Sequence, residues 1–292
     1  MSGPSRERAQ EDVSRLVDWF RREGADLPWR RTRDRYRVLV AEAQLQATPV
    51  ARVVPYYLSF VGRWPTPADL AASRLGDVLA AWHGLGYPRR ARNLHAAAQV
   101  VAARGWPEPE RLTDLPGVGP YTAAALRCFA DGEDVLPLDT NAARVVARRF
   151  PDGWPGAPGR GWEAGQAVMD LGRLWCTARA PRCGAGCPLR GGCPAADAGT
   201  VAEVTPPRRR QGRYEGSMRQ RRGRLLRELA TAGRSRCAGR SPPAPPAPRA
   251  ARARAPPGRS RRPPACRRGT PSARAAPRPG RAGSRGSSLR AR

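Results

Sequence analysis

The sequence predicts an all-α protein. Apolar residues recur at three- and four-residue spacings in one segment after another, and no segment shows the alternation of apolar and polar residues that marks a strand. The expected helices are joined by short loops, and the 292 residues are enough for one or two domains with a sizeable core. We therefore expect helix-on-helix packing, with about ten helices ahead of a cluster of cysteines.

The helical patterns can be followed in order along the chain. The first expected helix ends at Leu-Pro-Trp-Arg, residues 27–30, and carries four apolar residues on one face: Val13, Leu16, Val17 and Phe20. The helices expected after it cover residues 37–47, 50–63, 67–72, 75–82, 91–103 and 141–150.

A tight turn with two glycines lies between two helical patterns at residues 115–123, which read Leu-Pro-Gly-Val-Gly-Pro-Tyr-Thr-Ala. Gly117 and Gly119 flank Val118, so the backbone can turn sharply and no large side chain shields the amides. Backbone amides at the start of a helix bind anions such as phosphate. The sequence therefore predicts a hairpin between helices that can cradle an anion such as phosphate.

Two carboxylates lie in apolar surroundings, and each has two interpretations. Asp139 follows Val-Leu-Pro-Leu and directly precedes a predicted helix, so it is either a helix N-cap or a catalytic group. Glu42 lies among valine, leucine and alanine residues, so it is either on a solvated helix face or buried with a raised pKa. Position alone favours the N-cap for Asp139 and the solvated face for Glu42.

The charge balance indicates an anionic partner. The formal net charge of +29 and the isoelectric point near 11.6 favour nucleic acid, with an anionic membrane surface second. Seventeen arginines and no acidic residue lie in residues 234–292. All 53 basic residues are arginine, so no lysine can form a Schiff base, and lyase chemistry through lysine is excluded. Only an N-terminal amine would remain for such a reaction.

The N-terminal residues are polar and lack the apolar core of a signal peptide, and no apolar run is long enough to span a membrane. We therefore expect a cytoplasmic protein, nucleoid-associated if bacterial, with no membrane partner and no disulfides. Four cysteines within eighteen residues predict a metal site: Cys176, Cys183, Cys187 and Cys193. Their compact, uneven spacing favours a four-iron four-sulfur cluster, and zinc is the alternative.

Several segments together resemble the adenine DNA glycosylase (MutY) family of the helix-hairpin-helix DNA glycosylase superfamily. The resemblance covers roughly residues 10–196. It is carried by the hairpin at 115–123, Leu-Asp-Thr-Asn at 138–141, Val-Leu-Val-Ala-Glu-Ala-Gln-Leu-Gln-Ala-Thr-Pro-Val at 38–50, Trp-His-Gly-Leu-Gly-Tyr-Pro-Arg-Arg-Ala-Arg-Asn-Leu at 82–94, Gln-Ala-Val-Met-Asp-Leu-Gly at 166–172 and the cysteine loop.

The chain departs from the family pattern at a few positions. Gln44 stands where the family has methionine, Ala47 where it has a second glutamine, and Pro88 where it has a second tyrosine. The four cysteines are separated by six, three and five residues, against six, two and five in the family. The extra residue falls in a Gly-Ala-Gly segment that can bulge to absorb it.

The resemblance implies a fold of two helical domains. A six-helix barrel domain with the helix-hairpin-helix would span residues 31–135, and an iron-sulfur cluster domain would combine residues 8–30 with 136–196. One four-iron four-sulfur cluster would be held by the four cysteines. Residues 197–232 are expected to form a short helical extension, and the low-complexity basic tail at 233–292 is expected to be disordered, because it has little aliphatic bulk to bury.

The resemblance also implies roles for single residues. Glu42 would be the catalytic acid and Asp139 the carboxylate that faces the sugar, with Tyr121 and Asn141 in support. The residues implied to contact DNA are Gln46, Thr48, Tyr87 as a wedge, Gly117, Val118 and Gly119. The residues implied to line the adenine pocket or its rim are Trp29, Arg30, Leu45, Val50 and Gln166.

The implied activity is that of a monofunctional DNA glycosylase in base excision repair. It would hydrolyse the N-glycosidic bond of adenine mispaired with 8-oxoguanine or guanine in double-stranded DNA, and we expect it to act as a monomer. Two alternatives are open. One is an endonuclease III-like glycosylase for oxidised pyrimidines, which needs a lysine where this chain has Tyr121. The other is a non-catalytic helix-hairpin-helix DNA-binding protein.

Overall fold

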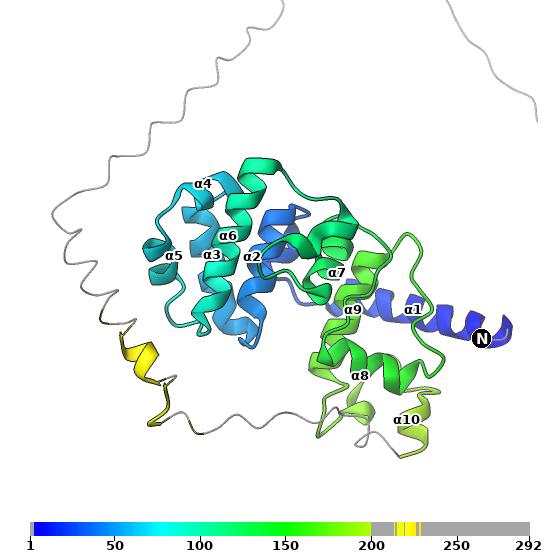
Figure 1. Ribbon diagram of the computed structural model, residues 1–292. Helices are drawn as coiled ribbons and strands as arrows, with labels where there is room; N and C mark the ends of the chain where they lie inside the picture. Colours follow the sequence, from blue (N-terminus) through cyan, green and yellow to red (C-terminus); the bar gives the residue numbers. More distant parts are fainter. Residues whose placement is uncertain (1–2, 200–212, 214, 219, 226–227, 229–292) are drawn as a thin grey trace, which may run out of the picture. The chain divides into compact units, whose positions relative to one another are not determined.

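The computed structural model describes residues 3–199, 213, 215–218, 220–225 and 228. Within these residues it is helical with no strand, so the predicted all-α class is confirmed (Figure 1). No helix in this part of the chain is long and apolar enough to cross a bilayer. The tail predicted to be disordered lies outside the described residues. Of the predicted extension, residues 220–225 are helical.

One hydrophobic core is built from consecutive elements in the first half of the chain. Its largest buried aromatic side chains meet edge to face, with ring centroids 4.8 Å apart for Phe60 and Trp64 and 6.0 Å apart for Phe60 and Trp82. The contributing elements are η1 (Pro28–Arg31), α2 (Arg35–Leu45), α3 (Val50–Arg63), α4 (Pro67–Ala72), α5 (Leu75–Ala81), α6 (Pro88–Arg104), η2 (Pro109–Asp114) and α7 (Pro120–Phe129).

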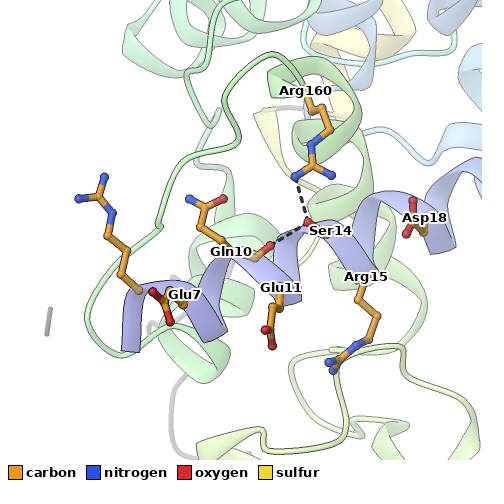
Figure 2. Close-up of a pocket in the computed structure, with 8 residues that line it drawn as sticks. Glu7, Gln10, Glu11, Ser14, Arg15, Asp18 and Arg160 are labelled. Atoms are coloured by element: carbon orange, nitrogen blue, oxygen red, sulfur yellow. Dashed lines mark hydrogen bonds between the residues drawn. The ribbon is translucent and has the colours of Figure 1, made fainter. Parts of the chain in front are cut away.

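A second core joins the start of the chain to its later helices. Helix α1 (Gly3–Glu23) packs against α9 (Gly161–Leu174), and α9 packs against α8 (Thr140–Arg149) (Figure 1). Polar contacts fasten α1 to the loop before α9. The Gln10 side-chain amide donates to the Pro155 carbonyl at 2.9 Å. The Arg160 guanidinium donates to the Ser14 hydroxyl at 3.0 Å (Figure 2).

Helix α2 is buried on almost all sides, because its residues 38–44 are apolar apart from Glu42 and Gln44. A helix that is apolar all round lies inside a protein rather than on its surface. The solvated face that position alone favoured for Glu42 is therefore wrong, since Glu42 is only 7% exposed. The N-cap of the helix is Asp34, whose carboxylate accepts a hydrogen bond from the Arg37 amide at 2.8 Å.

The predicted hairpin forms between η2 and α7. Gly117 has a φ of +81°, and a Cβ at this position would lie 2.6 Å from the Cβ of Asn93 on α6. Only glycine fits both the backbone conformation and the close approach. Gly119 is the N-cap of α7, so the turn delivers Tyr121 within the first turn of this helix.

Gln44 has no polar partner for its side chain. It is completely buried in the first core, and no protein group lies within hydrogen-bond distance of its amide oxygen or nitrogen. A buried amide without a partner loses the hydrogen bonds it makes to water in the unfolded chain, at a cost of roughly 1–3 kcal/mol.

Substituting Gln44→Met should therefore stabilise the protein, because methionine has a similar volume and no polar group to desolvate. We expect the free energy of unfolding, measured by urea denaturation, to rise by about 1–3 kcal/mol. The same substitution at the exposed α6 residue Gln99 is the matched control and should change it by less than about 0.5 kcal/mol. A less stable Gln44→Met variant would mean that the buried amide makes a favourable bond after all.

Candidate active site

The centre of the site is the buried Glu42, with the half-buried Tyr121 beside it. Burial raises the pKa of the Glu42 carboxyl to about 7, a hydrogen bond from Tyr121 opposes this shift, and the negative charge of Asp139 adds to it. The pKa of Tyr121 is raised for the same reasons, by burial first and then by the charges of the two carboxylates. The interactions show that α2, α7 and the start of α8 converge here. A carboxyl whose pKa is raised in this way can keep its proton near neutral pH.

Asp139 is the N-cap of α8, as one of its two interpretations predicted. One carboxylate oxygen accepts hydrogen bonds from the Asn141 amide at 2.9 Å and the Ala142 amide at 2.7 Å. The other accepts from the Asn141 side-chain nitrogen at 3.0 Å. The cap and a functional role do not exclude one another, because the capped carboxylate also acts electrostatically on Glu42.

Asn141 is itself held by a buried arginine. The Arg144 guanidinium donates to the Asn141 side-chain oxygen at 2.8 Å, to the Gly172 carbonyl at 2.9 Å and to the Cys176 carbonyl at 2.7 Å. These bonds fix the orientation of the Asn141 amide, so that its nitrogen points to Asp139. They also tie the start of α8 to the first cysteine.

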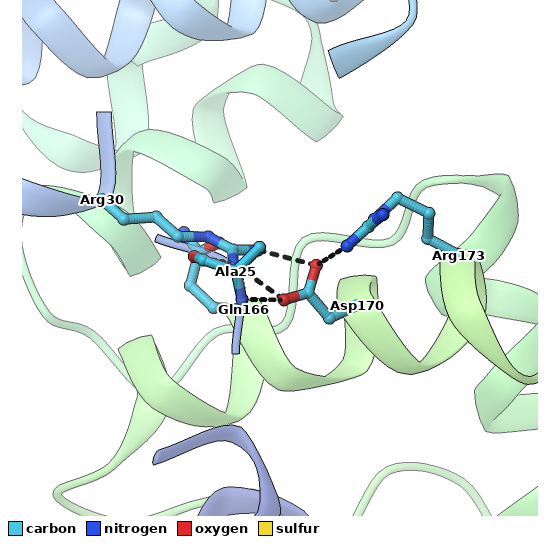
Figure 3. Close-up of polar contacts among 5 residues, drawn as sticks. All are labelled: Ala25, Arg30, Gln166, Asp170 and Arg173. Carbon is cyan, nitrogen blue, oxygen red and sulfur yellow. Dashed lines mark hydrogen bonds and ion pairs between the residues drawn. The ribbon is translucent and has the colours of Figure 1, made fainter. Parts of the chain in front are cut away.

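Arg30 and Gln166, predicted to line a base pocket, bond to one another and to a residue that the sequence did not single out. The Arg30 Nε donates to the Gln166 Oε1 at 2.6 Å, and its terminal nitrogens donate to both oxygens of Asp170 at 2.8 and 3.1 Å (Figure 3). Burial alone would raise the pKa of Asp170, but the hydrogen bonds and charge of Arg30 outweigh it, and the pKa is lowered. Arg30 thus clamps η1 to α9.

The other predicted pocket residues are apolar and lie at or near helix ends. The Trp29 ring is buried and meets the Tyr57 ring edge to face at 5.4 Å, so it belongs to the first core. Leu45 at the end of α2 and Val50 at the start of α3 are half-buried and pack against the same core.

Three residues predicted to contact DNA lie on two adjoining turns. Gln46 is exposed after α2, and the Thr48 hydroxyl donates to the Leu85 carbonyl at 3.4 Å, which links this turn to the one that carries Tyr87. Tyr87 is 50% exposed, an unusual degree for a large aromatic ring.

The hairpin offers fewer amides to an anion than its sequence suggested. The Val118 amide already donates to the Leu115 carbonyl at 3.0 Å, and the Val118 side chain is buried. Among the described residues, no acceptor lies within hydrogen-bond distance of the Gly119 and Tyr121 amides at the start of α7. These two amides point out of the first helical turn, where an anion is favoured.

The four predicted cysteine ligands surround one enclosed cavity. Its remaining lining consists of arginine and apolar side chains, with no carboxylate and no imidazole. No three potential ligands in the described part of the chain are close enough together to hold a single metal ion. Four thiolates without a carboxylate or an imidazole form a ligand set that suits a four-iron four-sulfur cluster, and zinc also accepts it.

The extra residue of the cysteine loop is absorbed locally. Cys183–Ala185 form the short 3-10 turn η3, which ends at Gly186 with a φ of +123°. The helix α10 (Pro194–Asp197) follows Cys193 directly. The expected bulge is therefore a 3-10 turn closed by a glycine, and the cysteines on both sides of it still line the same cavity.

Sequence reasoning missed Asp170 and Arg144, and it missed the partners of Arg90, because these contacts are made to distant residues or to the backbone. Asp170 had a usable signal, since it lies one helical turn after Gln166 on α9. Arg144 and Arg90 bind mainly carbonyl oxygens, which every residue has, so no side-chain pattern points to these contacts.

Comparisons with known proteins identify the family of this chain. Residues 40–155 match the family model described as HhH-GPD superfamily base excision DNA repair protein. An adenine DNA glycosylase of Mycobacterium tuberculosis is 44% identical over 239 residues, which cover 74% of this chain and 78% of the relative.

Two solved structures share the fold. A thermostable thymine-DNA glycosylase superposes with a TM-score of 0.60 at 26% identity, covering 66% of this chain and 98% of the other. An endonuclease III trapped in a covalent intermediate with DNA gives a TM-score of 0.55 at 22% identity, covering 66% and 97%, a likeness of fold alone. The mycobacterial relative and the family model show that the chain belongs to the adenine DNA glycosylase family and is a DNA glycosylase of base excision repair that hydrolyses N-glycosidic bonds.

Proposed function

We propose that this glycosylase releases adenine mispaired with 8-oxoguanine or guanine in double-stranded DNA. The observation that carries the proposal is the buried Glu42 carboxyl, whose pKa is raised to about 7 beside Tyr121 and Asp139. A carboxylic acid that keeps its proton near neutrality, next to a second carboxylate, supplies both groups that N-glycoside hydrolysis of a purine needs.

Before reaction, the adenine has to leave the base stack. Flipping a base costs a few kcal/mol and is easiest at a mispair. We propose that the Gly119 and Tyr121 amides hold the DNA backbone while Tyr87, with Gln46 and Thr48, fills the vacated space. The flipped base would enter between the apolar side chains of Leu45, Val50 and Trp29, with the linked Arg30 and Gln166 at the rim.

In the pocket, Glu42 donates its proton to a ring nitrogen of adenine. The neutral base then leaves with the electron pair of the glycosidic bond, and the sugar becomes an oxocarbenium-like cation. Proton donation of this kind contributes about 10²- to 10⁴-fold to a rate. Tyr121 lowers the pKa of Glu42 and so limits the rise that burial causes.

Asp139 stabilises the cation with its negative charge. Its three hydrogen bonds to Asn141 and Ala142 fix the carboxylate before the reaction, so no reorganisation is needed when the charge develops. Water then attacks the sugar carbon and gives a proton back to the ionised Glu42, so that the products are free adenine and an abasic site. No amine is required, in accord with a sequence that has no lysine.

We further propose that the cysteine cavity holds one four-iron four-sulfur cluster, bound by Cys176, Cys183, Cys187 and Cys193. When bound, such a cluster supplies four iron–thiolate crosslinks that fix the loop after α9. Arg144 donates to the carbonyl of Cys176, so the loop in turn orients Asn141 at the start of α8.

The two carboxylates can be tested with isosteric amides. Glu42→Gln removes the proton donor, and Asp139→Asn removes the negative charge while keeping an excellent helix N-cap. Each should lower adenine release from an A:8-oxoguanine duplex by about 10²-fold or more in single turnover, with duplex binding retained. The exposed Glu108→Gln is the control. Near-normal release by either site variant would refute these roles.

The same assay separates the reaction types. A hydrolase leaves an abasic site that is cut only after alkali, whereas a lyase cuts the strand without alkali. Strand scission without alkali, or release of oxidised pyrimidines but not adenine, would favour an endonuclease III-like activity. Tight binding with no release from any duplex would favour a non-catalytic DNA-binding protein.

The rate should fall as pH rises through about 7, because Glu42 acts in its protonated form and its pKa is raised to about 7. Single-turnover rates at saturating protein test this over a range of pH. Tyr121→Phe should move the midpoint to higher pH, since the hydrogen bond from Tyr121 lowers the pKa of Glu42. A rate that increases through neutral pH would instead identify Glu42 as a base.

Purified protein should be brown, with the broad visible absorption of an iron-sulfur cluster and about four iron atoms per chain. Cys187→Ser should reduce the iron content, while substitution of the buried Cys128, which donates to the Gly161 carbonyl away from the cavity, should not. Colourless protein containing zinc would contradict the cluster.

A further inference from the structure

Two exposed turns carry the strained backbone of this protein. Within the described residues, only Ala47 and Tyr87 have a positive φ without being glycine, at +54° and +47°. A left-handed conformation costs an alanine or a tyrosine free energy that glycine does not pay, so it persists only where neighbours impose it. Such outliers mark positions where a set conformation is useful.

One arginine binds both turns. The guanidinium of Arg90, in the first turn of α6, lies between the end of α2 and the loop that carries Tyr87. One terminal nitrogen donates to the carbonyls of Ala43, Gln44 and Gln46 at 2.7, 3.0 and 2.6 Å. The other donates to the carbonyls of Leu85 and Gly86 at 2.9 and 3.2 Å and to the Thr48 hydroxyl at 3.3 Å.

Aromatic rings complete the enclosure of this guanidinium. Its central carbon lies 5.5 Å from the ring centroid of Trp82 and 5.5 Å from that of Tyr87. The Trp82 indole nitrogen donates to the Gly86 carbonyl at 3.1 Å, which closes the loop around Arg90. Arg90 therefore contacts each residue of the turn from 85 to 87: the carbonyls of Leu85 and Gly86 and the ring of Tyr87.

These contacts account for the strain. Ala47 is exposed, and its methyl group has no polar atom that could stabilise the left-handed conformation through a hydrogen bond. Another residue therefore has to bind the groups on either side of Ala47. Arg90 holds the carbonyl of Gln46 before it and the hydroxyl of Thr48 after it. At the same time it binds the two residues that precede Tyr87. The planar fork of a guanidinium can bind two groups of acceptors at once, which a lysine ammonium cannot do from a single nitrogen.

We propose that Arg90 is a positioning residue that locks the turn at 46–48 and the Tyr87 turn together in the free protein, in the conformation in which they enter the duplex. This inference rests on the proposed function of the site. Its charge is taken up by protein carbonyls, so Arg90 serves the reaction through the geometry of Tyr87 and Gln46 rather than through a phosphate contact. Prior ordering of the two turns lowers the cost of inserting them into DNA.

Arg90→Lys tests this directly, because it keeps the charge and removes the fork. At saturating protein, we expect the single-turnover release of adenine from an A:8-oxoguanine duplex to fall on the order of 10²-fold, as for other small displacements of positioning groups. Arg89→Lys, the same change at the exposed neighbour on α6, should leave the rate unchanged. A normal rate in the Arg90→Lys variant overturns the proposal.

Ala47→Gly separates positioning from a general loss of stability. Glycine adopts the left-handed conformation without strain, so the rate loss caused by Arg90→Lys should be about tenfold smaller in the Ala47→Gly background. If Arg90 only stabilised the fold, glycine would not help, since it also favours the unfolded chain. An equal loss in both backgrounds contradicts the proposal.

Hydrogen exchange of the free protein tests the same contacts without DNA. Arg90→Lys should speed amide exchange in residues 46–48 and 85–87 and leave α9 unchanged. Protection of both turns as in the unsubstituted protein would overturn the inference. If the unsubstituted protein fails to release adenine, the proposed function falls, while the exchange result still decides whether Arg90 holds the turns.

Discussion

The burial of one carboxyl group in the middle of α2 is the constraint on which the rest of the site depends. An ionised carboxylate in an apolar helix is unfavourable, so Glu42 is displaced toward its neutral form and its pKa is raised to about 7. Two neighbouring groups change the size of this pKa shift. Asp139, on the other core, adds a negative charge, and Tyr121 limits the shift through a hydrogen bond. A group that would be an ordinary surface acid elsewhere becomes a proton donor at neutral pH.

Glu42 and Asp139 act on one another only if the two hydrophobic cores that carry them are held in a fixed relative position. Glu42 belongs to the core of α2 to α7, whereas Asp139 begins α8 in the core that α1 and α9 complete. Arg30 bridges the two through its bidentate bond to the buried Asp170, which also accepts the Ala25 amide at 3.2 Å. The side chains of this pair are 7% and 3% exposed, so the bridge is shielded from water. Loss of one partner would leave the other charge buried and unpaired, which is costly.

Several arginines of this protein stabilise its structure through hydrogen bonds, in addition to contributing positive charge. Arg30, Arg90 and Arg144 each bind several acceptors at fixed angles, and two of them bind chiefly backbone carbonyls. Arg148 adds a further example, with a donor 3.5 Å from the Cys176 sulfur and another bond to the Thr177 carbonyl at 2.8 Å. In a chain without lysine, the high net charge therefore overstates the number of cations that face a nucleic acid.

The helices and their order could be predicted because their signals are local. Apolar spacing, proline and glycine marked α3 and α4 to the residue, and the hairpin glycines fell where Gly117 needs a positive φ. The burial of Glu42 could not be predicted from spacing, because α2 is apolar on all sides and has no face to distinguish. The partners of Arg90 and Arg144 could not be predicted either, since carbonyl acceptors leave no trace in a sequence. The hydrogen bond from the Val118 amide to the Leu115 carbonyl could not be predicted either, because it depends on the exact geometry of the turn.

Infrared difference spectroscopy of the folded protein measures directly whether the Glu42 carboxyl is protonated. Titration of the unsubstituted protein against the Glu42→Gln variant should isolate one protonated-carboxyl stretching band that disappears with a midpoint near pH 7. A band that instead disappears around the ordinary glutamate value of 4.5 would show that Glu42 is ionised at neutral pH and cannot be the proton donor.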